Sequence, residues 1–179
     1  PSTSSAASDV YKRQLLRHKR CVSNISEFIS KSSFHRVLED DAYKKENNLI
    51  SLKKDNKIKK VVMCSGKIYY DLIEEREKTK NSDVVFIRLE QLYPFPAKTL
   101  AKVLKKYKKA KFVWCQEEPK NMGAWNTVRN YIERTLEMIN FKDINIKFVG
   151  RSASATTATG NANKHLAQQK EILEKILKD

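Results

Sequence analysis

Short apolar runs alternate with longer amphipathic stretches from Lys60 to the end of the chain. Short apolar runs bounded by turn residues indicate buried strands, and the stretches between them are long enough for helices. Strands that alternate with helices pair in parallel through right-handed crossovers, which gives a layered α/β fold. The pattern predicts strands at 60–64, 84–89, 112–115 and 144–149, and helices at 67–80, 96–107, 123–138 and 163–178.

The glycines predict where a site lies. The chain has four, Gly66, Gly123, Gly150 and Gly160, and each is expected in a turn between a strand and the next helix. In a parallel sheet these turns meet at the carboxyl edge, where ligands bind in open α/β folds. We therefore expect any site of this domain at that edge.

The run QEEPKNMGAW, after the third predicted strand, places two adjacent carboxylates just before a proline, a glycine and a tryptophan. A close pair of carboxylates can supply an acid beside a base. Neighbouring residues point in different directions, however, so the pattern favours a structural role. We expect Glu117 and Glu118 to bind backbone N–H groups or a basic partner across an interface. Trp125 is expected to pack there as an aromatic anchor.

Three residues are candidates for binding an anion. Ser65 and Lys67 open a helix directly after the first strand, where free N–H groups and the helix dipole favour negative charge. The same residues equally suit a plain helix N-cap. Arg151 starts a loop rich in Ser, Ala and Thr and is the best single candidate for a charged ligand, with an intramolecular salt bridge as the alternative.

The histidines and cysteines show no pattern that indicates catalysis, metal binding or disulfide formation. None of the three histidines has a partner at the spacing of metal ligands or of a catalytic triad, so no metal-binding or catalytic residue is expected. Cys21, Cys64 and Cys115 form no CxxC pair, which argues against a disulfide scaffold and fits a reducing compartment. Cys64 and Cys115, each expected at the end of a strand, are predicted to be buried thiols.

The formal net charge of +15 raises the alternative of a stand-alone basic nucleic-acid-binding module. The lysines are mixed with Glu and Asp on nearly every predicted helix, which is typical of a solvated surface. Nucleic acid is therefore not the favoured partner. No apolar run approaches the roughly 18 residues that a membrane span requires, so no membrane partner is expected.

Five blocks, in order, carry a resemblance: LLRH at 15–18, VVMCSGKIYYDL at 61–72, RLEQLYPFP at 88–96, the QEEP run, and GRSASA at 150–155. They resemble the C-terminal region of the thiamin-diphosphate-dependent first component of the 2-oxoglutarate dehydrogenase complex, over about residues 15–177. The resemblance implies a transketolase-like C-terminal domain: a small, mostly parallel sheet with one antiparallel strand, flanked by helices in three layers. Ser152 stands where the family usually has proline.

Enzymes of that family are several times longer, so the resemblance implies a C-terminal fragment. We predict a non-native leader at 1–14, a connector from the preceding pyrimidine-binding domain at 15–56, and the domain itself at 57–179. The family's thiamin diphosphate motif, magnesium ligands and substrate-binding histidines belong to preceding domains. The chain alone is therefore expected to hold no cofactor and to be inactive.

The intact enzyme would decarboxylate 2-oxoglutarate in the citric acid cycle and pass the succinyl group to lipoyl groups of the dihydrolipoyl succinyltransferase component. Expected partners are the upstream domains and a second copy in a homodimer. A 2-oxoadipate dehydrogenase is an alternative, because substrate-reading residues lie upstream. The compartment implied is the bacterial cytoplasm or the mitochondrial matrix.

The resemblance also implies an effector site. Family members bind nucleotide or acyl-CoA effectors on this domain, and in actinobacterial relatives an acyl-CoA contacts positions that match Gln91, Lys98 and Thr99 here. Lys98 keeps one cationic partner, whereas Thr99 replaces another. Any acyl-CoA or nucleotide is therefore expected to bind weakly.

Overall fold

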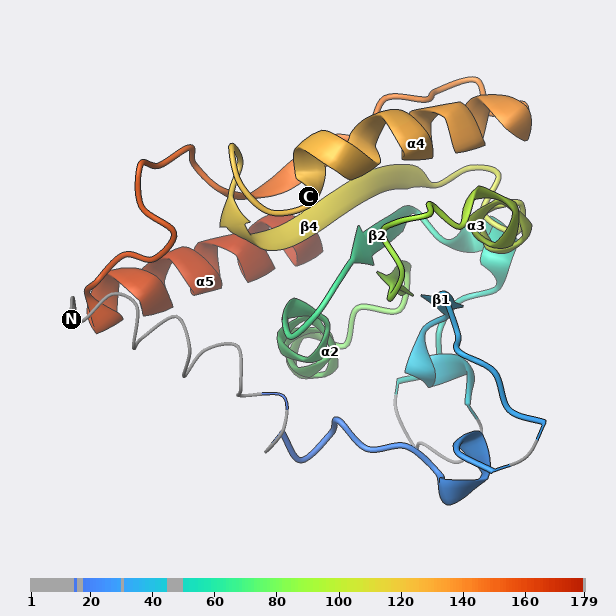
Figure 1. The fold of residues 1–179 in the computed structure, drawn as a ribbon, viewed down its shortest axis with the longest axis horizontal. Helices are drawn as coiled ribbons and strands as arrows, with labels where there is room; N and C mark the ends of the chain where they lie inside the picture. Colours follow the sequence, from blue (N-terminus) through green and yellow to red (C-terminus); the bar gives the residue numbers. More distant parts are fainter. Residues whose placement is uncertain (1–14, 16–17, 30, 45–49, 179) are drawn as a thin grey trace.

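The computed structural model describes residues 15, 18–29, 31–44 and 50–178, so the predicted leader at 1–14 lies outside the described residues. Its centre is a five-stranded sheet in the order β1-β3-β2-β4-β5 (Figure 1). Four strands are parallel, and β1 pairs antiparallel with β3 at one edge. The strands are β1 (Val37–Leu38), β2 (Lys60–Cys64), β3 (Val84–Leu89), β4 (Lys111–Pro119) and β5 (Lys147–Arg151).

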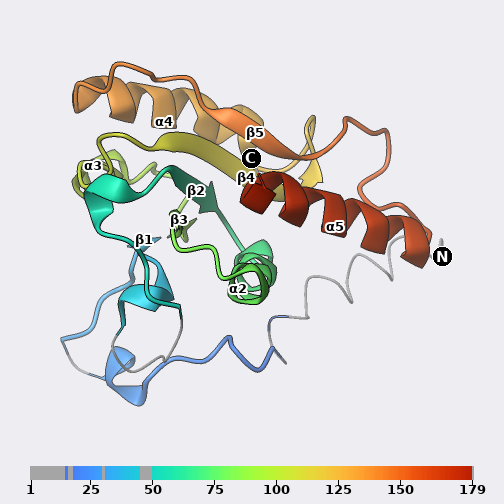
Figure 2. The same ribbon diagram turned by 180° about the vertical axis from the view of Figure 1, so that it is seen from behind.

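The four α-helices of the described residues cover the sheet, two on each face. The helices α3 and α4 pack on one face and α2 and α5 on the other, as both ribbon views show (Figures 1 and 2). This arrangement confirms the predicted three-layer α/β fold. The helices are α2 (Ile68–Thr79), α3 (Ala97–Leu104), α4 (Trp125–Met138) and α5 (Ala162–Lys178), with short 3-10 helices at Ile25–Glu27, Asp41–Tyr43 and Asp55–Lys57.

The central strands are buried on both faces, so they read as continuous apolar runs. Successive side chains still alternate: Val61 and Met63 enter the core under α3 and α4, whereas Val62 and Cys64 enter the core under α2 and α5. Burial of each large apolar side chain stabilises the fold by roughly 1.5–3 kcal/mol. The two cores therefore hold the helices against the sheet.

Two expectations about the carboxyl edge were wrong. The strand expected to end at Cys115 continues as β4 to Pro119, so the QEEP residues form strand rather than turn. Gly150 lies inside β5 and not in a turn. A Cβ atom at Gly150 would lie 2.8 Å from the backbone oxygen of Gln116 and 2.6 Å from Cζ of Phe148. Glycine is thus needed there for the close approach of β5 to β4.

A buried ion pair fastens the predicted connector to the domain. The Arg76 guanidinium on α2 donates from Nη1 and Nη2 to the two carboxylate oxygens of Asp40, at 2.5 and 2.8 Å, and both side chains are fully buried. Arg76 also donates to the carbonyl of Val84, and Asp40 accepts the backbone N–H of Phe86, both in β3. Segment 15–56 therefore supplies both β1 and the carboxylate that joins it to α2.

Candidate functional site

A polar cluster lies between α2 and α5 beside the carboxyl ends of β2 and β4. Lys67 donates to Asp71 at 2.6 Å and lies 3.9 Å from Glu117. Gln169 of α5 donates from Nε2 to both carboxylates, at 2.8 Å to Asp71 and 3.0 Å to Glu117. These four residues, here called the carboxyl-edge cluster, link both helices to the sheet.

The start of α2, where an anion site is predicted, is held by ion pairs within the chain. Lys67 occupies the N-cap position, with helical dihedral angles and without a side-chain cap bond. The Lys67 ammonium faces two carboxylates, which satisfy its charge within the chain. Binding of an anion by Ser65 and Lys67 therefore remains a prediction that these contacts do not favour.

The two adjacent glutamates do not act as a pair. Glu117 is buried in the carboxyl-edge cluster, whereas Glu118, the next residue of the same strand, is exposed. Successive strand residues point to opposite faces, which separates the two carboxylates. Within the described part of the chain, no group of three His, Cys, Asp or Glu side chains could hold a metal ion. Glu118 is the one of the two that a partner could reach.

Gln116 organises the end of β4, a role that the sequence did not reveal. Its Oε1 accepts hydrogen bonds from Nε1 of Trp114 at 2.9 Å and from the backbone N–H of Trp125 at 3.0 Å. Its Nε2 donates to the carbonyl of Met122 at 2.7 Å. Gln116 thus fixes the turn before α4, and Trp125 lies in the core with 5% of its surface exposed. An interface role for Trp125 stays a prediction.

Arg151 ends β5 with little access to solvent; 9% of its surface is exposed. Its Nη2 lies 2.9 Å from Nδ1 of His165, the first-turn histidine of α5. The described residues place no carboxylate within ion-pair distance, so the expected salt bridge is not found there. Burial, together with the positive charges of Arg151 and Lys67, lowers the pKa of His165 below its usual value. A neutral imidazole can accept the hydrogen bond from Arg151.

The predicted effector residues are only partly brought together. A hollow of about 430 Å³ lies between the end of β3, α3 and the segment before β1. Gln91 and Thr99 line it, but Lys98 is exposed and does not. The Gln91 side chain also donates to the carbonyl of Pro94 at 2.5 Å. The hollow, here called the Gln91 hollow, is lined by Ser33, Phe34, His35, Arg36, Val37, Gln91 and Thr99.

His35 and Arg36 enter this hollow from the predicted connector, where no periodic pattern pointed to them. The backbone carbonyl of Arg36 accepts the N–H groups of Glu90 and Gln91, which fixes the segment beside β3. A cation thus stands close to the block that includes Gln91, although it comes from a different part of the chain than the sequence predicted.

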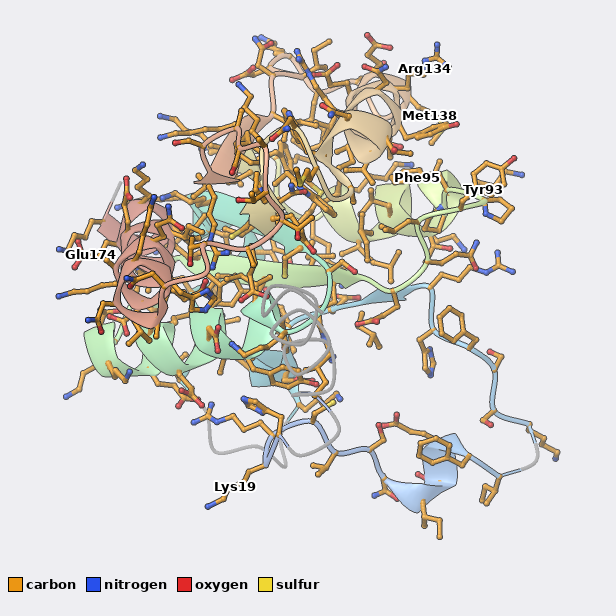
Figure 3. All side chains as sticks on the ribbon, turned by 60° about the vertical axis from the view of Figure 1, so that its left-hand side comes forward. Lys19, Tyr93, Phe95, Arg134, Met138 and Glu174 are labelled. Carbon is orange, nitrogen blue, oxygen red and sulfur yellow. The ribbon has the colours of Figure 1, made fainter. Side chains whose placement is uncertain are left out.

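Several large apolar side chains are exposed, and two groups of them stand out. The connector exposes Val22, Ile25 and Phe28, each with at least 75% of its surface accessible. Tyr93, which precedes α3, and Met138, the last residue of α4, project outward at one corner of the molecule (Figure 3). Exposed apolar residues that gather on one segment mark interaction surfaces. None of the described helices has the length and apolar character needed to cross a membrane.

Comparison with known proteins gives one consistent result. The family model described as 2-oxoglutarate dehydrogenase C-terminal matches residues 22–177. A protein of Brucella anthropi named 2-oxoglutarate dehydrogenase E1 component is 53% identical over 165 residues, and its namesake in Brucella ovis is 52% identical. Each alignment covers 92% of this chain but 16% of the relative. The chain therefore spans about one-sixth of the length of these curated relatives.

Proposed function

Because the chain belongs to the 2-oxoglutarate dehydrogenase C-terminal family, we propose that it is the assembly and regulatory domain of the first component of that complex. The main support is the pattern of coverage: the likeness extends over nearly all of this chain and over a small part of each relative. The whole enzyme would decarboxylate 2-oxoglutarate on thiamin diphosphate and transfer the succinyl group to lipoyl groups in the citric acid cycle.

The described residues gather no evident ligand set for the magnesium that accompanies thiamin diphosphate. Magnesium prefers several oxygen ligands in octahedral geometry, and no suitable set of carboxylates is gathered among the described residues. The acidic residues of the carboxyl-edge cluster are already bound by Lys67 and Gln169. We therefore assign thiamin diphosphate and magnesium to other domains of the enzyme, and this chain to assembly.

The exposed connector supports the assembly role. Val22, Ile25 and Phe28 lie in the segment that the resemblance joins to the preceding domain. Covering large apolar side chains of this kind would bring a favourable hydrophobic contribution to domain docking. The proposed partners are the upstream domains and a second copy, with the dihydrolipoyl succinyltransferase component as the acceptor in the complex.

Activity measurements test this proposal. The chain alone, supplied with 2-oxoglutarate, thiamin diphosphate and magnesium, should release no carbon dioxide. Joined to upstream domains of a first component, it should restore both turnover and dimerisation. Turnover by the isolated chain would refute the assignment. Equal turnover of the upstream domains with and without this chain would also count against it. Comparing 2-oxoglutarate with 2-oxoadipate in the joined enzyme would decide the substrate.

The Gln91 hollow supports a second proposal, that a nucleotide or acyl-CoA effector binds there weakly. Arg36 can pair with a phosphate oxygen, and Gln91 and Thr99 can contribute hydrogen bonds. Calorimetric titration of acetyl-CoA and AMP into the joined enzyme should give weak binding. Arg36→Ala should lower the affinity about tenfold, because a charge-assisted contact is lost. Lys98→Ala should change it less, since Lys98 lies outside the hollow. Tight binding unaffected by either substitution would place the effector elsewhere.

The nucleic-acid alternative receives little support from the surface. Lysines on several elements pair with carboxylates, including Lys53 with Asp83 at 3.1 Å and Lys175 with Glu171 at 2.6 Å. These contacts disperse the positive charge. The nucleic-acid alternative would be favoured if the DNA affinity of this chain fell steeply with salt concentration while that of a control protein of equal charge did not.

A further inference from the structure

A second cavity is lined by the end of β5, by the loop that joins β5 to α5 and by the start of α5. That loop lies at the other end of the molecule from β1 (Figures 1 and 2). The volume of the cavity is about 100 Å³. Arg151, the last residue of β5, lies on one side, and the first two turns of α5 lie on the other. The side chains that matter for its chemistry are those of Arg151, Ser154, Thr156, Thr157, Lys164 and Gln168.

The charge of Arg151 is unbalanced in this cavity. Arg151 is about nine-tenths buried and its Nε has no hydrogen-bond partner; among the described residues, its side chain is bound by His165 alone. None of the residues that line the cavity carries a carboxylate. A buried cation without a counter-charge is costly, and buried charges are ordinarily paired. The cavity thus has a strong donor without an acidic acceptor.

The surroundings add donors of the same kind. Lys164 brings a second cation, and the hydroxyl groups of Ser154, Thr156 and Thr157 can each donate a hydrogen bond. The cavity also adjoins the N-terminal end of α5, where the helix dipole favours negative charge. Asn161 caps that end by accepting the N–H of Lys164 at 3.1 Å, which holds the lysine at the rim.

We propose that this cavity, here called the Arg151 cavity, binds a phosphate group. A tetrahedral phosphate presents several acceptor oxygens, which matches two cations and several hydroxyl groups converging from different directions. A carboxylate has two oxygens in one plane and would leave more of these donors unpaired. The space would hold several waters, and hence one phosphate, but no larger body. The site is separate from the Gln91 hollow and does not depend on the proposed effector there.

The test is a titration of the full 179-residue chain with inorganic phosphate at constant chloride concentration. Heteronuclear NMR spectra are recorded at each step of the titration. Saturable shifts should appear in loop 152–161 and at His165. Arg151→Gln should weaken binding at least tenfold, because it removes the buried charge-assisted donor. Lys164→Gln should weaken it several-fold. Arg129→Gln is the matched control: Arg129 lies on α4 and its Nε binds Glu133 at 2.8 Å, so affinity should stay unchanged.

Three results would overturn the inference. Phosphate could cause no saturable shifts, or the affinity could be the same in the wild type and in Lys164→Gln. Sodium acetate could also bind as tightly as phosphate, with the same dependence on Arg151, which would make the ligand a carboxylate. If Arg151→Gln does not fold, Lys164→Gln and Thr157→Val still test whether phosphate binds in the cavity. Both residues line the cavity and are exposed, so their replacement should leave the core intact.

Discussion

Replacing Asp40 by Asn should be among the most destabilising single-atom changes in this chain. Asp40 and Arg76 are both fully buried, and the carboxylate is the counter-charge of the guanidinium. The asparagine is nearly the same size, so no cavity forms and packing is retained. What changes is the charge, because the Arg76 cation then stays buried without an anion.

The magnitude follows from the contacts. Breaking one side of a buried ion pair costs about 3–5 kcal/mol. The single amide oxygen of asparagine can accept from Phe86 N–H or from Ala42 N–H but not replace both carboxylate oxygens, which adds about 1 kcal/mol. Domains are stable by only about 5–15 kcal/mol. Asp40→Asn should therefore remove a large share of the total stability.

Urea unfolding followed by circular dichroism measures the effect. With a slope of about 2 kcal/mol per molar urea, the midpoint should fall by roughly 2–3 M. Glu39→Gln is a matched control one residue away: Glu39 pairs with Lys106 on the surface, so its loss should cost less than about 1 kcal/mol. Adding Arg76→Met to Asp40→Asn should recover stability, since the unpaired cation is removed. An Asp40→Asn midpoint close to that of Glu39→Gln would refute the reasoning.

Three further predictions rest on single side chains. Gln116→Glu should cost about 2–4 kcal/mol in urea unfolding, because the amide that donates to the carbonyl of Met122 becomes an acceptor. His165 should titrate by NMR below pH 6.5, and Arg151→Gln should raise that midpoint. The unfolded chain binds the proton more readily, so stability should fall as the pH drops below about 6.5; stability that rises there would contradict the assignment. Cys21 alone should react with a thiol reagent in the native protein, because burial raises the pKa of both strand cysteines; three fast thiols would disprove this.

The sequence was sufficient to locate the strands that form clear apolar runs. The strands β2 and β3 lie where the apolar runs predicted them, because both faces of each strand are buried and the pattern is strong. It was insufficient for β1, two residues of a polar connector whose pairing with Arg88 and Leu89 depends on tertiary contacts. The end of β4 was missed because Gln116 and Glu117, although polar, are buried as strand residues.

The candidate sites show a similar division. Arg151 was identified because a lone cation opens a loop of small hydroxyl residues, and that loop indeed forms one wall of a cavity. Its neutral partner His165 could not be anticipated, because the two lie 14 residues apart and their contact depends on where α5 packs. Arg36 was missed for the same reason: its place in the Gln91 hollow is set by the path of the connector around β3.

The Asp40–Arg76 pair has one more consequence, for association between molecules. Strand β1 is only two residues long, so it covers β3 at Arg88 and Leu89 and leaves the rest of that strand open to its outer side. There, the carboxylate of Asp40 accepts a hydrogen bond from the N–H of Phe86, and the guanidinium of Arg76 donates one to the carbonyl of Val84. Side chains thus occupy the groups through which a foreign strand would add to the sheet. A variant that lost the pair would expose unpaired backbone groups at this edge of the sheet, and we expect it to aggregate.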